Sequence, residues 1–142
     1  MAEHVLRRIL QQVGVEQVEV GSAGLFAMEG MHASRETQQL LREAGLDASE
    51  HRARRLTTDA VDDADLVFVM EPFQREELIR RMPQAASKVH LLKPYGLPAL
   101  EPNEYPGIHD PIGKPMEVYE VCFTQIRDAI ARVAKSLGVR AT

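Results

Sequence analysis

The sequence has little cysteine: Cys122 is the one cysteine in 142 residues. A single cysteine excludes an internal disulfide framework and a zinc site built from several cysteines. The five histidines show no spacing that is typical of metal ligands, and His51 and His109 are better explained as hydrogen-bonded structural or surface groups. We therefore expect no metal and no cofactor.

Long apolar runs and an excess of positive charge are also lacking. No stretch is long and apolar enough to be a membrane span, and the first residues do not resemble a signal peptide. A net charge of −4 and a pI near 5.7 give no support for a nucleic acid or membrane partner. We expect neither partner, and we expect a cytoplasmic location. The sequence does not predict the oligomeric state.

Helical and strand patterns alternate along the chain, without a linker or an internal repeat. The predicted helices cover about 2–13, the stretch from a Ser34 cap to Gly45, about 72–82 and about 116–137, with a short turn from Thr57 or Thr58 to Asp63. The predicted strands cover 15–20, 66–70 and 89–92, and a loop rich in proline and glycine spans 93–115. The whole chain, 1–142, is predicted to be one domain.

This alternation favours an α/β fold, in which three layers (α/β/α) enclose a small parallel sheet. Residues 66–70 are all apolar, which is typical of a strand covered on both faces. Ligands of such sheets bind outside the carboxyl ends of the strands. The segments 21–30, 70–73 and 109–113 are therefore the places where functional residues are expected.

Asp110 is the best chemical candidate in these segments. It precedes Pro111, which restricts it to extended geometry, and it lies close to the start of the last predicted helix. A loop carboxylic acid in such a place can protonate a leaving group. A turn aspartate without a catalytic role is the alternative explanation, and turn statistics alone favour it.

Four segments of the sequence form a recognisable series: Ser22-Ala23-Gly24, His51-Arg52-Ala53-Arg54-Arg55-Leu56, Asp65-Leu66-Val67-Phe68-Val69-Met70-Glu71, and Asp110-Pro111-Ile112-Gly113 followed by Glu117-Val118-Tyr119. Taken in this order, they resemble the low-molecular-weight protein-tyrosine-phosphatase family, and the overall pattern resembles its bacterial branch, which includes protein-arginine phosphatases. Each segment alone is weak evidence. Their order over nearly the whole chain carries the resemblance.

The resemblance implies a sheet with strand order 2-1-3-4 and hydrolysis of a phosphorylated protein or peptide through a phosphocysteine intermediate. It implies that Asp110 is the general acid and that Phe26 and Ile112 border the substrate. Tyrosine-selective members usually carry an aromatic residue at the position of Ile112. Phosphotyrosine and phosphoarginine therefore both remain possible substrates, and Asp110 could contact the guanidinium group of the latter. Arsenate reduction would need further cysteines for a thiol relay.

The family also has a first strand and a phosphate loop, Cys-x5-Arg, before a Ser-Pro-Met-Ala-Glu segment. The sequence starts at Met1-Ala2-Glu3, so we expect an N-terminally truncated domain that lacks this strand and loop. Cys122 lies on the apolar stripe of the last predicted helix and is not expected to replace the nucleophile. The 142 residues should then be inactive. A misassigned start is the favoured explanation, and a non-catalytic phosphatase-like binding module is the alternative.

A missing first strand also has a structural consequence. In the order 2-1-3-4 the missing strand would lie between the predicted strands at 15–20 and 66–70. These two strands would then lie about 10 Å apart across the vacant position. We expect the structure to show one of three outcomes: direct pairing of these two strands, recruitment of a strand from a second copy, or an unfilled position.

Overall fold

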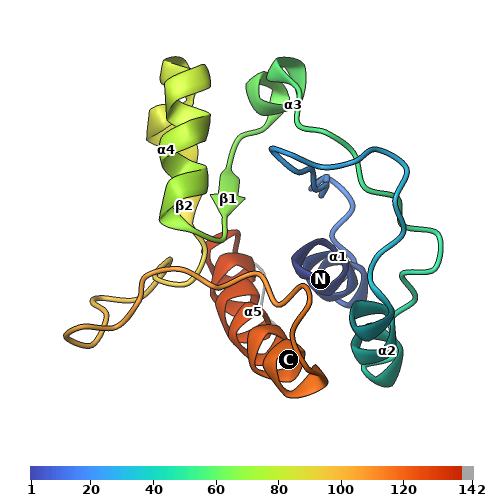
Figure 1. Cartoon of the computed structure of the whole chain (residues 1–142). Coiled ribbons are helices and arrows are strands. Elements are labelled where there is room, and N and C mark those ends of the chain that lie inside the picture. The colour runs from blue at the N-terminus through green and yellow to red at the C-terminus, as the bar shows by residue number, and fades with distance from the viewer. Residues whose placement is uncertain (139–142) are drawn as a thin grey trace.

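The computed structural model describes residues 1–138 of the chain (Figure 1). Its elements in order are α1 (Ala2–Gln12), α2 (Arg35–Glu43), α3 (Thr58–Asp63), β1 (Val67–Val69), α4 (Pro72–Arg81), the 3-10 helix η1 (Pro83–Lys88), β2 (Val89–Leu91) and α5 (Met116–Ser136). Every predicted helix is present, and its ends lie within one or two residues of the prediction. Residues 93–115 form neither helix nor strand, as expected for that loop.

Side-chain caps explain why α2 and α3 begin where they do. The Ser34 hydroxyl accepts a hydrogen bond from the backbone N–H of Thr37, at 3.2 Å. The Thr57 hydroxyl accepts one from the N–H of Ala60, at 3.1 Å. Each cap satisfies a backbone donor that the first helical turn leaves without a partner. Thr57, rather than Thr58, is therefore the cap of the short helix.

The sheet of the described residues consists of β1 and β2, which pair in parallel. Val67 lies opposite Val89, and Val69 lies opposite Leu91. These strands are the predicted segments 66–70 and 89–92, slightly shortened at their ends. Their adjacency agrees with the order expected for the third and fourth strands of the family.

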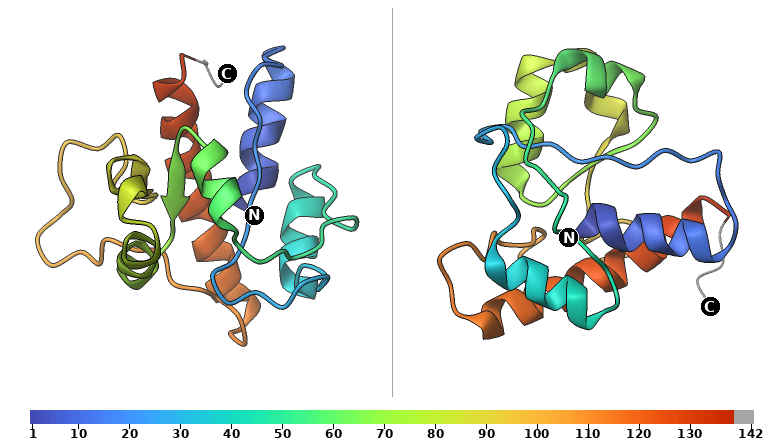
Figure 2. Two further views of the ribbon diagram at one scale, coloured as in Figure 1. Left: turned by 90° about the horizontal axis from the view of Figure 1, so that it is seen from above. Right: turned by 90° about the vertical axis from the view of Figure 1, so that its right-hand side faces the viewer.

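Each face of this small sheet packs against its own layer of helices. Val69 and Val89 lie in one apolar cluster with Leu78 of α4 and Val61 of α3. On the opposite face, Phe68 packs against the cluster that contains the buried residues of α5. The arrangement is the predicted three-layer α/β/α architecture, with α3 and α4 on one side and α1 and α5 on the other (Figures 1 and 2).

Helix α5 is the main support of the second layer. It packs against both α1 and α2, and Figure 2 shows α1 lying along its C-terminal part. Its buried stripe contains Cys122, as predicted, together with Tyr119, Phe123, Ile126, Ala129, Ile130, Val133 and Ala134. Within residues 1–138, this and the other helices are too short or too polar to cross a membrane.

The strand predicted at 15–20 is not formed, and this prediction is wrong. The segment is extended but has no ladder with β1 or with any other strand of the described chain. Its apolar side chains instead pack on α1: Val15, Val18 and Val20 lie against Leu10 and the neighbouring apolar residues. Residues 15–20 carry valines at 15, 18 and 20 with glutamates at 16 and 19, and this pattern reflects burial of the valines against a helix rather than strand pairing. Of the three expected outcomes, direct pairing of this segment with β1 does not occur.

Candidate functional site

A cavity of about 320 Å³ lies beyond the carboxyl end of β1. Five parts of the chain form it: the start of α1, the beginning of α2 with its cap, the connection from β1 into α4, the loop that leads into α5, and the buried face of α5 itself. Its lining residues are Met1, Ala2, Ser34, Thr37, Met70, Glu71, Gln74, Ile108, His109, Asp110, Pro111, Ile112, Tyr119, Cys122 and Ile126. The position is the one predicted for ligands of a parallel sheet.

The loop that carries Asp110 is anchored to the end of β1. The N–H of Ile108 donates a hydrogen bond to the carbonyl of Met70, at 2.8 Å. Gly107 comes so close to this strand end that a Cβ atom there would lie 2.9 Å from the same carbonyl oxygen. Glycine is needed at this close approach, and the anchored loop places the following residues beside the cavity.

Asp110 itself is exposed and lies at the cavity wall. Its Oδ1 accepts a hydrogen bond from the backbone N–H of Ile112, at 3.0 Å. This bond closes a local turn of the kind that aspartate commonly forms. The carboxyl group thus has a fixed position in the turn while its other oxygen remains available to a ligand.

A second acidic residue, Glu71, stabilises the same loop, and the sequence analysis did not single it out. Its Oε1 accepts a hydrogen bond from the Tyr105 hydroxyl at 3.1 Å and lies 3.3 Å from Nδ1 of His109. The rings of Tyr105 and His109 are stacked, with centroids 4.2 Å apart. Partial burial, together with the nearby Glu71 carboxylate, raises the pKa of Tyr105. The position of Glu71 directly after an all-apolar strand was the signal that could have identified it.

The structure brings Asp110 and Ile112 together at this cavity but leaves Phe26 outside its lining. Ile112 is 70% exposed, so its side chain lies at the opening of the cavity. Phe26 is 69% exposed. The Cζ atom of Arg81 lies over the Phe26 ring, 5.3 Å from the centroid of that ring. Their roles as substrate-bordering residues therefore stay predictions, with better geometric support for Ile112.

Cys122 forms part of the cavity wall from within α5 and is buried. Burial raises the pKa of its thiol, and the Asp110 carboxylate adds to this shift. A thiol in such surroundings is held in its protonated, weakly nucleophilic form. The positive N-terminal amino group acts in the other direction and lowers the pKa of the thiol, but the effect of burial is larger.

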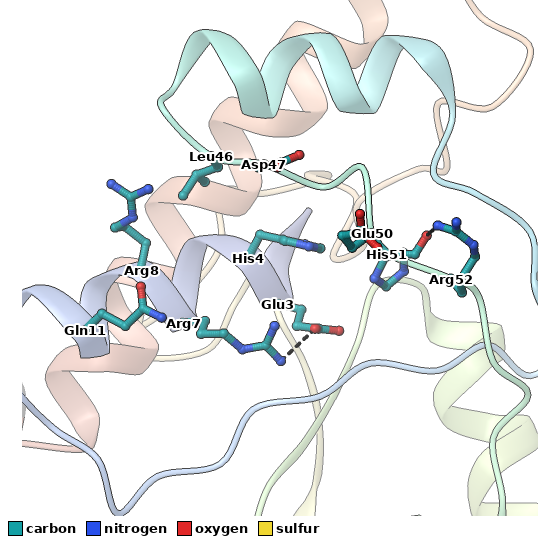
Figure 3. A pocket seen from close by; sticks show the side chains of 10 residues that line it. All are labelled: Glu3, His4, Arg7, Arg8, Gln11, Leu46, Asp47, Glu50, His51 and Arg52. Atoms are coloured by element: carbon teal, nitrogen blue, oxygen red, sulfur yellow. Dashed lines mark hydrogen bonds and ion pairs between the residues drawn. The ribbon is translucent and has the colours of Figure 1, made fainter.

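A second cavity, of about 430 Å³, lies on another side of α1 (Figure 3). It is lined by Glu3, His4, Arg7, Arg8, Gln11, Leu46, Asp47, Glu50, His51 and Arg52. Burial lowers the pKa of His4. Burial by itself would raise the pKa of Glu3, but hydrogen bonds and charge from Ser22 and Arg7 hold it below its ordinary value. The sequence alone does not indicate this cavity, because its lining residues come from two distant parts of the chain.

The family described as "Low molecular weight phosphotyrosine protein phosphatase" matches residues 1–141. The fold is thus that of an α/β domain with a cavity at its strand ends. The match over residues 1–141 shows that the chain belongs to this phosphatase family. The fold and the family predicted from the sequence are both confirmed.

Individual relatives support the same assignment. A protein-arginine-phosphatase of Geobacillus stearothermophilus is 33% identical over 129 residues, which are 91% of this chain and 83% of that protein. A probable low molecular weight protein-tyrosine-phosphatase of Ralstonia solanacearum is 32% identical over 92% of this chain and 81% of its own length. The solved arginine phosphatase structure from Geobacillus stearothermophilus superposes with a TM-score of 0.84 at 32% identity, covering 96% of this chain and 82% of that one.

Proposed function

We propose that this domain serves the hydrolysis of phosphorylated proteins or peptides, with Asp110 as general acid. The observation that carries the proposal is the position of Asp110 at the wall of the cavity beyond β1. In the chemistry that the family resemblance implies, a cysteine thiolate attacks phosphorus and the bond to the leaving group breaks. Asp110 would give its proton to the departing atom and then take a proton from the water that hydrolyses the phosphocysteine.

We propose phosphoarginine as the preferred substrate and phosphotyrosine as the alternative. Two carboxylates, Glu71 and Asp110, line the cavity, and both could attract a guanidinium group. Ile112 offers an apolar wall without the ring that would stack on a phosphotyrosine. The relatives include proteins named for either substrate, so the comparison leaves the choice to the local residues.

We further propose that a polypeptide of these 142 residues is inactive by itself. The sequence contains no Cys-x5-Arg motif, since the position six residues after Cys122 is Asp128. Phosphoryl transfer depends on a thiolate nucleophile and on donors that hold the phosphoryl oxygens. General acid catalysis alone contributes only about 10²–10⁴-fold.

The test compares residues 1–142 with a chimera that carries the strand and Cys-x5-Arg loop of the Geobacillus stearothermophilus relative before Met1. The 142 residues should not hydrolyse p-nitrophenyl phosphate, phosphotyrosine or phosphoarginine, and the chimera should. Asp110→Ala in the chimera should lower kcat far more than it raises KM, which marks a transition-state role. Unchanged kcat would remove Asp110 from the mechanism.

Two further variants sharpen this test. Ile112→Tyr in the chimera should shift the preference towards phosphotyrosine, and an unchanged preference would show that Ile112 does not border the substrate. Turnover by the 142 residues that disappears with Cys122→Ser would show that Cys122 is the nucleophile and that the inactivity proposal is wrong.

A non-catalytic binding module is the second candidate, favoured by the raised pKa of the buried Cys122 thiol. It predicts that residues 1–142 bind phosphoarginyl or phosphotyrosyl peptides without turnover and that Asp110→Asn alters this binding. Calorimetry with both peptides separates the two candidates. In either case we propose cytoplasmic phosphoproteins as the partners, rather than nucleic acid or a membrane, and cell fractionation tests that location.

A further inference from the structure

The second cavity brings His51 close to Glu3 and His4, which lie almost fifty positions earlier in the sequence. Glu3 and His4 lie at the start of α1, and His51 lies in the connection between α2 and α3. One possible ligand atom from each residue lies within 4.8 Å of those of the other two. We propose that Glu3, His4 and His51 bind a divalent transition metal ion and that zinc suits this site best.

The donor set fits zinc in both type and number. Zinc is bound by imidazole nitrogen and carboxylate oxygen at about 2.0–2.2 Å, and two histidines with one glutamate form a known three-ligand arrangement. Neighbouring ligand atoms of a tetrahedral zinc site lie about 3.3 Å apart by this geometry. The observed spacing of up to 4.8 Å therefore has to contract by at most about 1.5 Å, which rotations of the partly exposed side chains can supply.

His4 supplies an independent observation that points to a ligand. Its Nδ1 is buried and has no hydrogen-bond partner within residues 1–138. Buried polar atoms normally have partners, so an unsatisfied one needs an explanation. The His4 ring points towards His51 in Figure 3, and the two rings meet edge to face with centroids 5.2 Å apart. A metal ion bound at Nδ1 of His4 would give this atom the partner that it lacks, and a nitrogen of His51 would be a second ligand.

Glu3 is already oriented by groups around it. Its Oε1 accepts a hydrogen bond from the Ser22 hydroxyl, and its Oε2 lies 2.7 Å from the Arg7 guanidinium group. Hydrogen bonds of this kind orient metal-binding carboxylates in known sites. Each carboxylate oxygen can accept more than one interaction, so Glu3 can keep these partners and still bind a metal ion.

The charges of the cavity permit a cation despite nearby arginines. Arg7, Arg8 and Arg52 line it, but Glu3, Asp47 and Glu50 line it too and balance their charge. The volume of about 430 Å³ leaves room for water or another ligand at the fourth position of the metal. The two cavities share no lining residue, so this inference stands apart from the proposed phosphatase function.

The first test titrates residues 1–142 with Zn²⁺ in a calorimeter and with Co²⁺ in a spectrophotometer. We expect one ion per chain and visible Co²⁺ absorption of the strength typical of four-coordinate sites. His4→Ala and His51→Ala should each weaken binding by at least about 10-fold, the lower limit seen even for groups that only support a metal ligand. The matched control is His32→Ala, since His32 is exposed and lies outside the cluster.

Wild-type affinity in His51→Ala, or equal weakening in His32→Ala, would overturn the proposal. A measurement on the unaltered chain covers the case in which a variant fails to fold. On addition of Zn²⁺, the NMR signals of the His4 and His51 rings should shift together at one equivalent, while those of His90 and His109 stay in place. Shifts at His90 or His109 alone, or no shift at all, would show that the cluster binds no metal.

Discussion

Two regions whose apolar patterns both predict strands reach different structures in this molecule. Residues 67–69 and 89–91 form the parallel pair β1–β2, whereas residues 15–20 remain extended without a ladder. In both regions valine side chains are shielded from water by neighbouring helices. The difference lies in the backbone, which has a paired neighbour in the first region and none in the second.

The comparison teaches that apolar alternation predicts which side chains are buried but does not guarantee a strand. A strand needs the N–H and C=O groups of a neighbour at ladder spacing. Residues 15–22 are held by side chains of α1 instead: an Arg7 nitrogen donates a hydrogen bond to the carbonyl of Val20 at 2.6 Å, and Glu3 accepts one from Ser22. A segment held this way should open more easily than β1–β2.

The largest expected effect comes from Leu92, the residue directly after β2. It is fully buried against the core of α5, and its N–H donates to the carbonyl of Val69. Leu92→Ala should lower the free energy of unfolding by about 2–5 kcal/mol, because it removes buried methyl groups and leaves a cavity. Denaturant unfolding followed by circular dichroism measures this loss.

Leu97→Ala is the matched control, since Leu97 lies in the following loop and is 40% exposed. The same substitution there should change the free energy of unfolding by no more than about 0.5 kcal/mol. Equal effects of the two substitutions would contradict the placement of the core on the α5 face of the sheet.

The core and the layers were predictable from sequence because they depend on local pattern. Periodicity and capping chemistry predict the buried stripe of α5, the Ser34 cap and the two strands that pair. They leave Thr57 and Thr58 as alternative caps of α3, and the structure shows that Thr57 is the cap. Residues 15–20 were not predictable in the same way. Their state depends on which segments lie beside them, and a single sequence does not record that.

The candidate sites show the same contrast between residues that the sequence predicts and contacts that form only on folding. The position of Asp110 and Ile112 beside the cavity was predictable because they share one loop whose place follows the order of segments in a known family, and their roles stay predictions. The interaction of Glu71 with Tyr105 joins residues 34 positions apart, and only the folded chain reveals it. His4 and His51 are likewise brought together by packing, so histidine spacing in the sequence did not indicate their cluster.

A matched pair of valines measures the difference between the two regions directly. Val89 of β2 is 1% exposed, whereas Val18 is only half-buried against α1. Val89→Ala should cost about 2 kcal/mol from two lost methyl groups and incomplete repacking. Val18→Ala should cost less than about 1 kcal/mol. Urea titration measures the free energy of unfolding of both variants. A larger loss of this free energy for Val18→Ala would mean that residues 15–20 belong to the main core.

A smaller and more local effect is expected from Arg7→Ala. The substitution removes the hydrogen bond to Val20 and the ion pair with Glu3, two contacts of an exposed side chain. Global stability should fall by no more than about 1 kcal/mol, but amide exchange at residues 15–22 should accelerate. Arg8→Ala is the control, because Arg8 donates to the carbonyl of Gly45 and does not contact this segment. Equal acceleration in both variants would show that α1 as a whole, rather than Arg7, restrains the segment.

The smallest effect should appear on acidification and should also be confined to residues 15–22. Burial opposes the charge of Glu3, yet Ser22 and Arg7 together hold its pKa below the ordinary 4.5. A carboxyl group with a lowered pKa stabilises the folded state fully above its unfolded pKa and loses that contribution as the pH falls through its folded pKa. With EDTA present, the protection factors of the amides at residues 15–22, which correct for the intrinsic pH dependence of exchange, should therefore fall below pH 4.5 before those of β1–β2 fall. Glu3→Gln should remove this pH dependence, and a response that persists in Glu3→Gln would assign the acid sensitivity to another carboxyl group.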